Sequence, residues 1–98
     1  MAKFTTRVEL YGSPTWDDYD NLHSAMRKEG FTQTISFQGE TTVWHLPTAE
    51  YNRDADLSTD AIRDSAKRAA ATAWDNSAVL VTKADGGRSI YNLRKVQS

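Results

Sequence analysis

The chain carries two histidines, His23 and His45, and histidine is the side chain best suited to proton transfer near neutral pH. His23 precedes Met26 at helical spacing, which is typical of a ring that packs at the edge of a hydrophobic core. His45 lies between Trp44 and Leu46, so it points to the open face of a sheet if those two residues face the core. His45 is therefore the stronger candidate for chemistry. The alternative is a half-exposed cross-strand residue without a chemical role.

Other reactive arrangements are missing from the sequence. The 98 residues include no cysteine, which excludes disulfides, thiolate nucleophiles and cysteine-based zinc sites. The carboxylates and histidines show no metal-ligand spacing, and the acidic run at Asp17, Asp18 and Asp20 is explained by helix capping. Phosphate-binding glycine loops and the serine elbow of hydrolases do not occur. We therefore expect no metal, no cofactor and no nucleotide-dependent enzyme.

The charge is unevenly distributed along the chain. A net charge of −1 gives the whole molecule no attraction for nucleic acid or for an anionic membrane. The last 24 residues carry four cations against two carboxylates, which could hold a phosphate backbone while an aromatic ring stacks on a base. The expected nucleic-acid-binding residues are Tyr11, Lys83, Arg88, Tyr91 and Arg94. The alternative is a solvated edge strand whose charges prevent association between sheets.

The elements that must position these residues begin with a strand. Period-two alternation predicts a first strand over residues 4–11, and a helix then starts at the cap Thr15 and ends at Gly30. Alternation and β-branched residues return in residues 31–37 and 41–46, which predicts a hairpin that the following proline ends.

The second half begins with residues 48–56, a polar stretch that predicts a loop and a candidate site. Ser58 caps a second helix, whose buried stripe is rich in alanine. Residues 78–82 predict an apolar strand, and the Asp85-Gly86-Gly87 turn joins it to a final strand over residues 89–93.

This order, β-α-β-β-α-β-β, predicts a single α+β domain over residues 1–98 with the ferredoxin-like split βαβ arrangement and an extra C-terminal strand. Two helices then cover one face of an antiparallel sheet whose first and third strands are central. The topology permits RNA binding, although the aromatic and glycine motif of an RNA-recognition module is missing. No apolar run is long enough to span a membrane and no signal-peptide core is present, so a cytoplasmic protein without membrane contact is expected.

Several segments resemble one family over most of the chain. They are residues 3–10, 17–26, 29–35, 45–51 and 79–82, which include Thr-Thr-Arg-Val-Glu-Leu and His-Leu-Pro-Thr-Ala-Glu-Tyr. The chain resembles the small bacterial proteins grouped with the toxin–antitoxin protein GhoS, which are similar in fold to the ferredoxin-like nucleases of CRISPR adaptation. The namesake is an endoribonuclease antitoxin that cleaves the messenger RNA of a membrane toxin. The resemblance implies a cytosolic single-strand endoribonuclease.

If that activity accompanies the fold, RNA cleavage without a metal needs a base for the ribose 2′-hydroxyl proton, an acid for the leaving oxygen and a cation for the phosphate charge. Arg7, His45 and Glu50 are the nearest side chains that offer these roles, and they are the candidate catalytic residues.

Two hypotheses follow. The first is a protein that binds single-stranded RNA, with cleavage left open, through the sheet face around Arg7, Tyr11 and His45. The second is a non-catalytic protein–protein interaction module, for instance one encoded on a mobile element. It would dock a partner or a second copy of itself through a sheet edge or an exposed patch of Tyr11, Val43, His45 and Tyr51.

Overall fold

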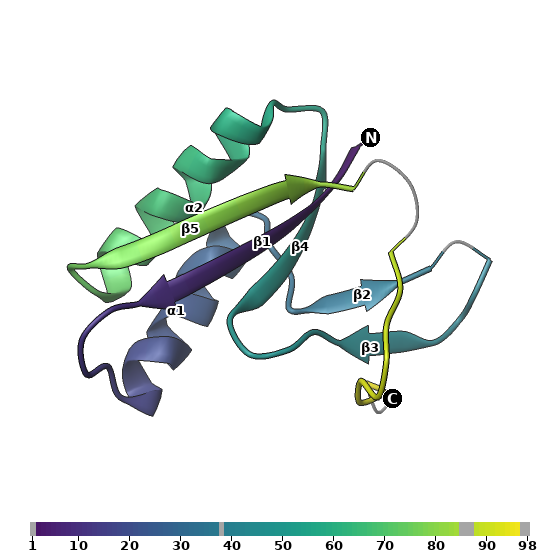
Figure 1. Ribbon diagram of the computed structural model, residues 1–98, viewed down its shortest axis with the longest axis horizontal. Coiled ribbons are helices and arrows are strands. Elements are labelled where there is room, and N and C mark those ends of the chain that lie inside the picture. Colours follow the sequence, from purple (N-terminus) through teal and green to yellow (C-terminus); the bar gives the residue numbers. More distant parts are fainter. Residues whose placement is uncertain (1, 38, 85–87, 97–98) are drawn as a thin grey trace.

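The computed structural model describes residues 2–37, 39–84 and 88–96 of the chain (Figure 1). Its elements follow in the order β1 (Ala2–Leu10), α1 (Trp16–Lys28), β2 (Thr34–Ser36), β3 (Val43–His45), β4 (Glu50–Ala55), α2 (Thr59–Ala73) and β5 (Ser77–Lys83). An antiparallel three-stranded sheet has the order β4-β1-β5, and β2 and β3 form a separate antiparallel pair. The predicted α+β class is confirmed.

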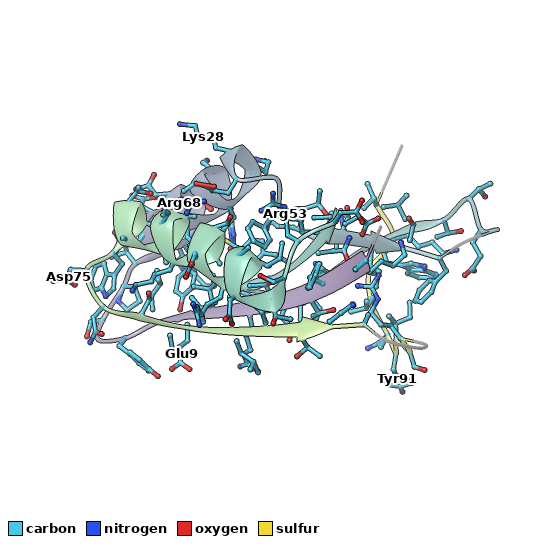
Figure 2. All side chains as sticks on the ribbon, turned by 90° about the horizontal axis from the view of Figure 1, so that it is seen from above. Glu9, Lys28, Arg53, Arg68, Asp75 and Tyr91 are labelled. Atoms are coloured by element: carbon cyan, nitrogen blue, oxygen red, sulfur yellow. The ribbon has the colours of Figure 1, made fainter. Side chains whose placement is uncertain are left out.

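Alternate residues of β1 face the core, as the sequence predicts. Phe4 and Val8 are buried against the helices, and Glu9 is exposed on the opposite side. Both helices lie on one face of the three-stranded sheet (Figure 2). We call the other face the open sheet face. The apolar core contains Phe4, Val8, Leu10, Leu22, Met26, Phe31, Tyr51, Ala55, Ile62, Ala66, Ala69 and Ala70.

The helix ends are also as predicted. The Thr15 hydroxyl accepts a hydrogen bond from the backbone N–H of Asp18, and the Asp18 carboxylate accepts one from the backbone N–H of Thr15. Gly30 follows α1 with φ of 94°, a left-handed conformation that suits glycine. Ser58 caps α2, whose small buried residues Ala66 and Ala69 let the helix lie close to the sheet. No helix in the described ranges is both long enough and apolar enough to cross a membrane.

The prediction of a loop over residues 48–56 was wrong, because this stretch contains β4. It pairs antiparallel with β1, and Tyr51 and Ala55 are buried on the helix side. The alternation was hidden because Arg53, between them, also lies on the inner side. The Arg53 guanidinium lies over the Phe31 ring, 5.3 Å from its centroid, where its stem provides apolar cover.

The predicted strand order also differs from the structure. The β2–β3 hairpin extends away from the three-stranded sheet (Figure 1) and approaches β4 through the isolated bridge between Thr32 and Asn52. The central strand β1 therefore lies between β4 and β5, and the predicted third strand is not central. Residues 33–36 and 43–46 hydrogen-bond to each other, as the predicted hairpin requires, whereas the separation of this hairpin from the sheet was not predicted.

The last predicted strand, residues 89–93, is not a strand, and its predicted turn at residues 85–87 lies outside the described residues. The chain instead crosses to the hairpin. The backbone N–H of His45 donates to the Arg94 carbonyl at 2.8 Å, and the N–H of Val96 donates to the Val43 carbonyl at 2.8 Å. We call residues 88–96 the C-terminal segment. It forms an antiparallel neighbour of β3, with Trp44 opposite Lys95.

Candidate functional site

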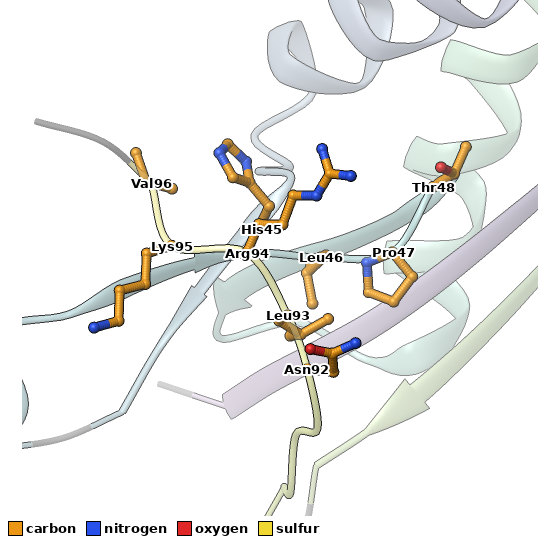
Figure 3. Close-up of a pocket in the computed structure, with 9 residues that line it drawn as sticks. All are labelled: His45, Leu46, Pro47, Thr48, Asn92, Leu93, Arg94, Lys95 and Val96. Atoms are coloured by element: carbon orange, nitrogen blue, oxygen red, sulfur yellow. The ribbon is translucent and has the colours of Figure 1, made fainter.

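The pairing of the C-terminal segment with β3 places His45 beside Arg94. Side chains alternate between the two faces of extended backbone, so residues on neighbouring strands share a face. Figure 3 shows the His45 imidazole and the Arg94 guanidinium projecting side by side to one side, and Leu46 and Leu93 projecting to the other. One face of this strand pair is thus polar and basic, and the other carries leucines.

Residues 45–48 and 92–96 line an open groove of about 1390 Å³, which we call the C-terminal groove (Figure 3). This volume exceeds the range of about 300–1,000 Å³ typical of small-molecule pockets, so a longer ligand fits it better. The lining includes Arg94, Lys95 and His45, and none of these described lining residues is acidic. The described lining is therefore locally basic on a molecule whose overall charge is −1.

A smaller hollow of about 340 Å³ borders His45 on its other side. Arg27, in the last turn of α1, lines this hollow together with Thr34, the register partner of His45. His45 thus lies between Arg27 on one side and Arg94 on the other. The sequence does not single out Arg27, because a cation in the last turn of a helix is explained by the helix dipole alone.

The predicted catalytic residues are not gathered in one place. Arg7 and Glu50 are register partners on β1 and β4, so they are neighbours on the open sheet face. His45 was expected on a central strand next to β1, but it belongs to the separate hairpin. In the part of the chain that the structure describes, its ring forms no hydrogen bond with Arg7 or Glu50.

The predicted nucleic-acid-binding residues are also dispersed. Tyr11 follows one end of β1, and Lys83 pairs with Phe4 near the other end. Arg88, Tyr91 and Arg94 all belong to the C-terminal segment. Arg88 and Tyr91 line one cavity and Arg94 lines another, and Tyr11 and Lys83 line neither.

The expected exposed patch of Tyr11, Val43, His45 and Tyr51 does not exist. Tyr51 is fully buried, Tyr11 follows the end of β1, and Val43 belongs to β3 of the separate two-stranded sheet. The prediction failed because it depended on residues 48–56 being a loop, whereas β4 turns Tyr51 toward the helices.

Another cavity, of about 380 Å³, lies between the C-terminal segment and the open sheet face. We call it the sheet-face cavity. Its polar lining includes Thr5, Glu50, Arg88 and Tyr91. Nη1 of Arg88 donates to Asn52 Oδ1 at 2.6 Å and to Thr5 Oγ1 at 3.3 Å, so the guanidinium is fixed on the sheet.

His23 has a structural role, in line with its helical spacing. Its Nδ1 lies 2.6 Å from the buried Tyr51 hydroxyl, and the two rings pack with centroids 5.7 Å apart. Burial lowers the pKa of His23, partly opposed by the nearby Asp20 carboxylate. Burial also raises the pKa of Tyr51, so both groups are neutral at pH 7.

Within the described residues, no group of three or more histidine and carboxylate side chains is placed to hold a metal ion. No family model matches the chain, and no curated protein and no solved structure matches it either.

Proposed function

We propose that this protein binds single-stranded RNA by its phosphate backbone in the C-terminal groove. The observation that carries the proposal is the adjacency of His45 and Arg94 on one wall of a groove without an acidic lining residue. An arginine guanidinium makes paired, charge-assisted hydrogen bonds with phosphate oxygens. Arg27, on the far side of His45, extends the same basic surface.

A single strand suits this surface better than a duplex. The groove offers a few cations, whereas stable duplex binding depends on many phosphate contacts. Proteins that bind single strands combine a basic groove with an aromatic side chain that stacks on a base. Tyr91, in the same segment as Arg94, is 92% exposed and supports this mode.

RNA cleavage is the finer part of the proposal, and the resemblance to the GhoS group motivates it. His45 would take the proton of the ribose 2′-hydroxyl, the 2′ oxygen would attack the adjacent phosphorus, and the bond to the 5′ oxygen would break. Water would protonate the leaving oxygen, and Arg94 would stabilise the added charge on the phosphate. Arg94 replaces Arg7 as the cation that stabilises the phosphate charge, because Arg94 lies beside His45 and Arg7 does not.

We also propose that the domain is a ferredoxin-like variant with the β2–β3 hairpin inserted between α1 and β4. The support is that β4 and β5 flank β1 antiparallel and are joined by α2, as in a split βαβ unit. The bridge from Thr32 to Asn52 then marks the place of the missing second strand.

The test is incubation of the pure protein with a fluorescein-labelled single-stranded RNA of mixed sequence. We expect salt-sensitive binding, measured by fluorescence anisotropy, that Arg94→Gln and Arg27→Gln both weaken. The matched control is Lys67→Gln, which removes an exposed cation on α2 that lines neither the C-terminal groove nor the hollow beside His45. Wild-type protein that shows no salt-sensitive binding would contradict the proposed function.

The same samples test cleavage, with EDTA and with magnesium. We expect products with a 2′,3′-cyclic phosphate in EDTA, and a loss of at least about 100-fold in rate for His45→Ala, which is the usual effect of removing a general base. Intact RNA under both conditions would make the cleavage step wrong and leave the binding proposal standing.

A second candidate function is docking of a protein chain at the β5 edge. β5 pairs with β1 on one side, and no strand in the described ranges pairs with its other side. Leu80 at its centre is 65% exposed, which favours pairing with another strand. Light scattering tests this candidate, since a strict monomer at high concentration would argue against self-pairing.

A further inference from the structure

We propose that the sheet-face cavity is a base pocket that selects guanine in the RNA strand held by the C-terminal groove. The inference rests on the proposed function and adds the chemical class of base that the protein recognises. It is carried by the position of the cavity, its stacking ring and the two charged groups that line it.

The base pocket lies on the reverse side of the strand pair that forms the groove. Leu46, Pro47 and Leu93 line both cavities. Figure 3 shows Leu46 and Leu93 directed away from His45 and Arg94, so one layer of backbone separates the apolar wall of the pocket from the basic face. A strand whose phosphate lies beside Arg94 can therefore turn its base around the edge of this layer into the pocket.

The size and walls of the pocket suit a flat aromatic ligand. Its volume of about 380 Å³ lies at the low end of small-molecule sites, and Ile35 and Ile90 add to the apolar wall. Tyr91 also lines it, although the ring is 92% exposed. An exposed tyrosine beside an apolar wall is the arrangement in which an unpaired RNA base stacks.

Glu50 and Arg88 supply the polar edge of the pocket. Arg88 uses Nη1 for Thr5 and Asn52, which fixes the guanidinium while its other N–H groups remain as donors. The Glu50 carboxylate accepts no side-chain hydrogen bond from a described residue, so its oxygens remain as acceptors.

This pair of charged groups distinguishes guanine from the other bases. Guanine presents two adjacent donors, N1–H and the 2-amino group, which match the two oxygens of one carboxylate. Its O6 and N7 acceptors match a guanidinium. Adenine and cytosine place an acceptor next to their amino donor, and uracil places its single donor between two acceptors. Each of these would set a lone pair against the Glu50 carboxylate.

Backbone conformation singles out the same place. In the described chain, the non-glycine residues with positive φ are Ala49, at 63°, and Asn92, at 57°. Ala49 directly precedes Glu50, and Asn92 directly follows Tyr91. The strain at Ala49 is held by a hydrogen bond from the Val8 N–H to its carbonyl, at 3.0 Å. Such conformations cost free energy and concentrate at binding sites.

The experiment measures the affinity of four heptanucleotides by fluorescence anisotropy at one salt concentration. Each is a uridine strand whose central nucleoside is guanosine, inosine, adenosine or uridine. We expect the guanine strand to bind about tenfold more tightly than the uracil strand, as one paired hydrogen-bonding contact to a base provides. Inosine lacks the 2-amino group and should fall between them.

The readout for Glu50→Gln is the ratio of the guanine and uracil dissociation constants, which cancels any change in phosphate binding. We expect the ratio to fall to near one. Glu9→Gln is the matched control, because it removes the same charge from the open sheet face without touching the pocket. Arg94→Gln should weaken all four strands and leave the ratio as in the wild type.

The outcomes separate the inference from the proposed function. Salt-sensitive binding with equal affinity for all four strands would overturn the base pocket and leave the groove standing. A preference for adenine, or a guanine preference that survives Glu50→Gln, would also overturn the pocket as described. Failure of every strand to bind would overturn both.

Discussion

Thr6 shows how a single side chain limits the stability of the core. It is fully buried on β1, and its Oγ1 has no hydrogen-bond partner among the residues that the structure describes. A buried hydroxyl without a partner keeps the cost of desolvation, about 1–3 kcal/mol. Valine has the same shape without the hydroxyl. We therefore expect Thr6→Val to raise the free energy of unfolding by about 1 kcal/mol in urea titrations.

The control for this change is Thr82→Val on the exposed side of β5. It should alter the free energy of unfolding by less than about 0.5 kcal/mol, as surface substitutions usually do. A Thr6→Val protein less stable than the wild type would show that the hydroxyl has a partner after all.

The His23–Tyr51 contact predicts an acid-sensitive fold. Burial lowers the pKa of His23, so below the unfolded value of 6.5 the unfolded chain binds the proton more readily than the folded one. The full stability is therefore present above pH 6.5 and is lost as the pH falls from there toward the folded pKa. Melting temperatures between pH 7.5 and 5 should decline in the wild type.

His23→Gln should flatten this decline, whereas His45→Gln, an exposed position, should keep it. The Asp20 carboxylate raises the pKa of His23 and the Arg27 guanidinium lowers it, and each of these effects is smaller than that of burial. An unchanged pH profile in His23→Gln would assign the acid sensitivity to other groups.

At the scale of the element, the C-terminal segment creates both cavities yet contributes little to the core. Among the described residues, the buried apolar ones lie between Phe4 and Ala70, whereas Arg88, Tyr91 and Arg94 lie in the segment. A chain that ends at Ala84 should thus keep its helical circular dichroism and a cooperative thermal transition. It should lose RNA binding in the anisotropy assay. Full RNA affinity in the shortened chain would place the binding site elsewhere.

The sequence predicted those elements whose signals are local. The cap at Thr15, the left-handed Gly30 and the alternation of β1 each depend on neighbouring residues, and each was predicted correctly. β4 was missed because Arg53 places a charged residue on the inner side, where its stem covers Phe31. The last strand failed because pairing of residues 94–96 with β3 is a contact between distant parts of the chain, which periodicity does not encode.

The candidate site was predictable to the same extent. His45 and Arg94 were recognised by residue type, since histidine can transfer a proton and arginine can bind a phosphate. Their adjacency depends on the crossing of the C-terminal segment, and the separation of His45 from Arg7 depends on the hairpin leaving the sheet. Both are properties of the tertiary structure.

At the scale of the whole molecule, the net charge of −1 means that the proposed RNA binding depends on a few local contacts. The three-stranded sheet and its helices form the stable body, and the hairpin with the C-terminal segment extends from it (Figure 1). Arg27, from the end of α1, joins the two parts at the basic surface. We therefore expect binding to release only a small number of counterions from the RNA.

The most direct test of the central claim is the salt dependence of binding to a uridine heptanucleotide. Each arginine that holds a phosphate of a single strand contributes about −0.7 to the slope of log K against log salt, so Arg27 and Arg94 predict a slope of about −1.4. Lys95 is not counted, because its Nζ lies over the Trp44 ring, 5.8 Å from the centroid. Arg94→Gln should reduce its magnitude by about 0.7, and Lys67→Gln should leave it unchanged. A flat dependence in the wild type, or equal slopes for Arg94→Gln and the wild type, would contradict RNA binding in the C-terminal groove.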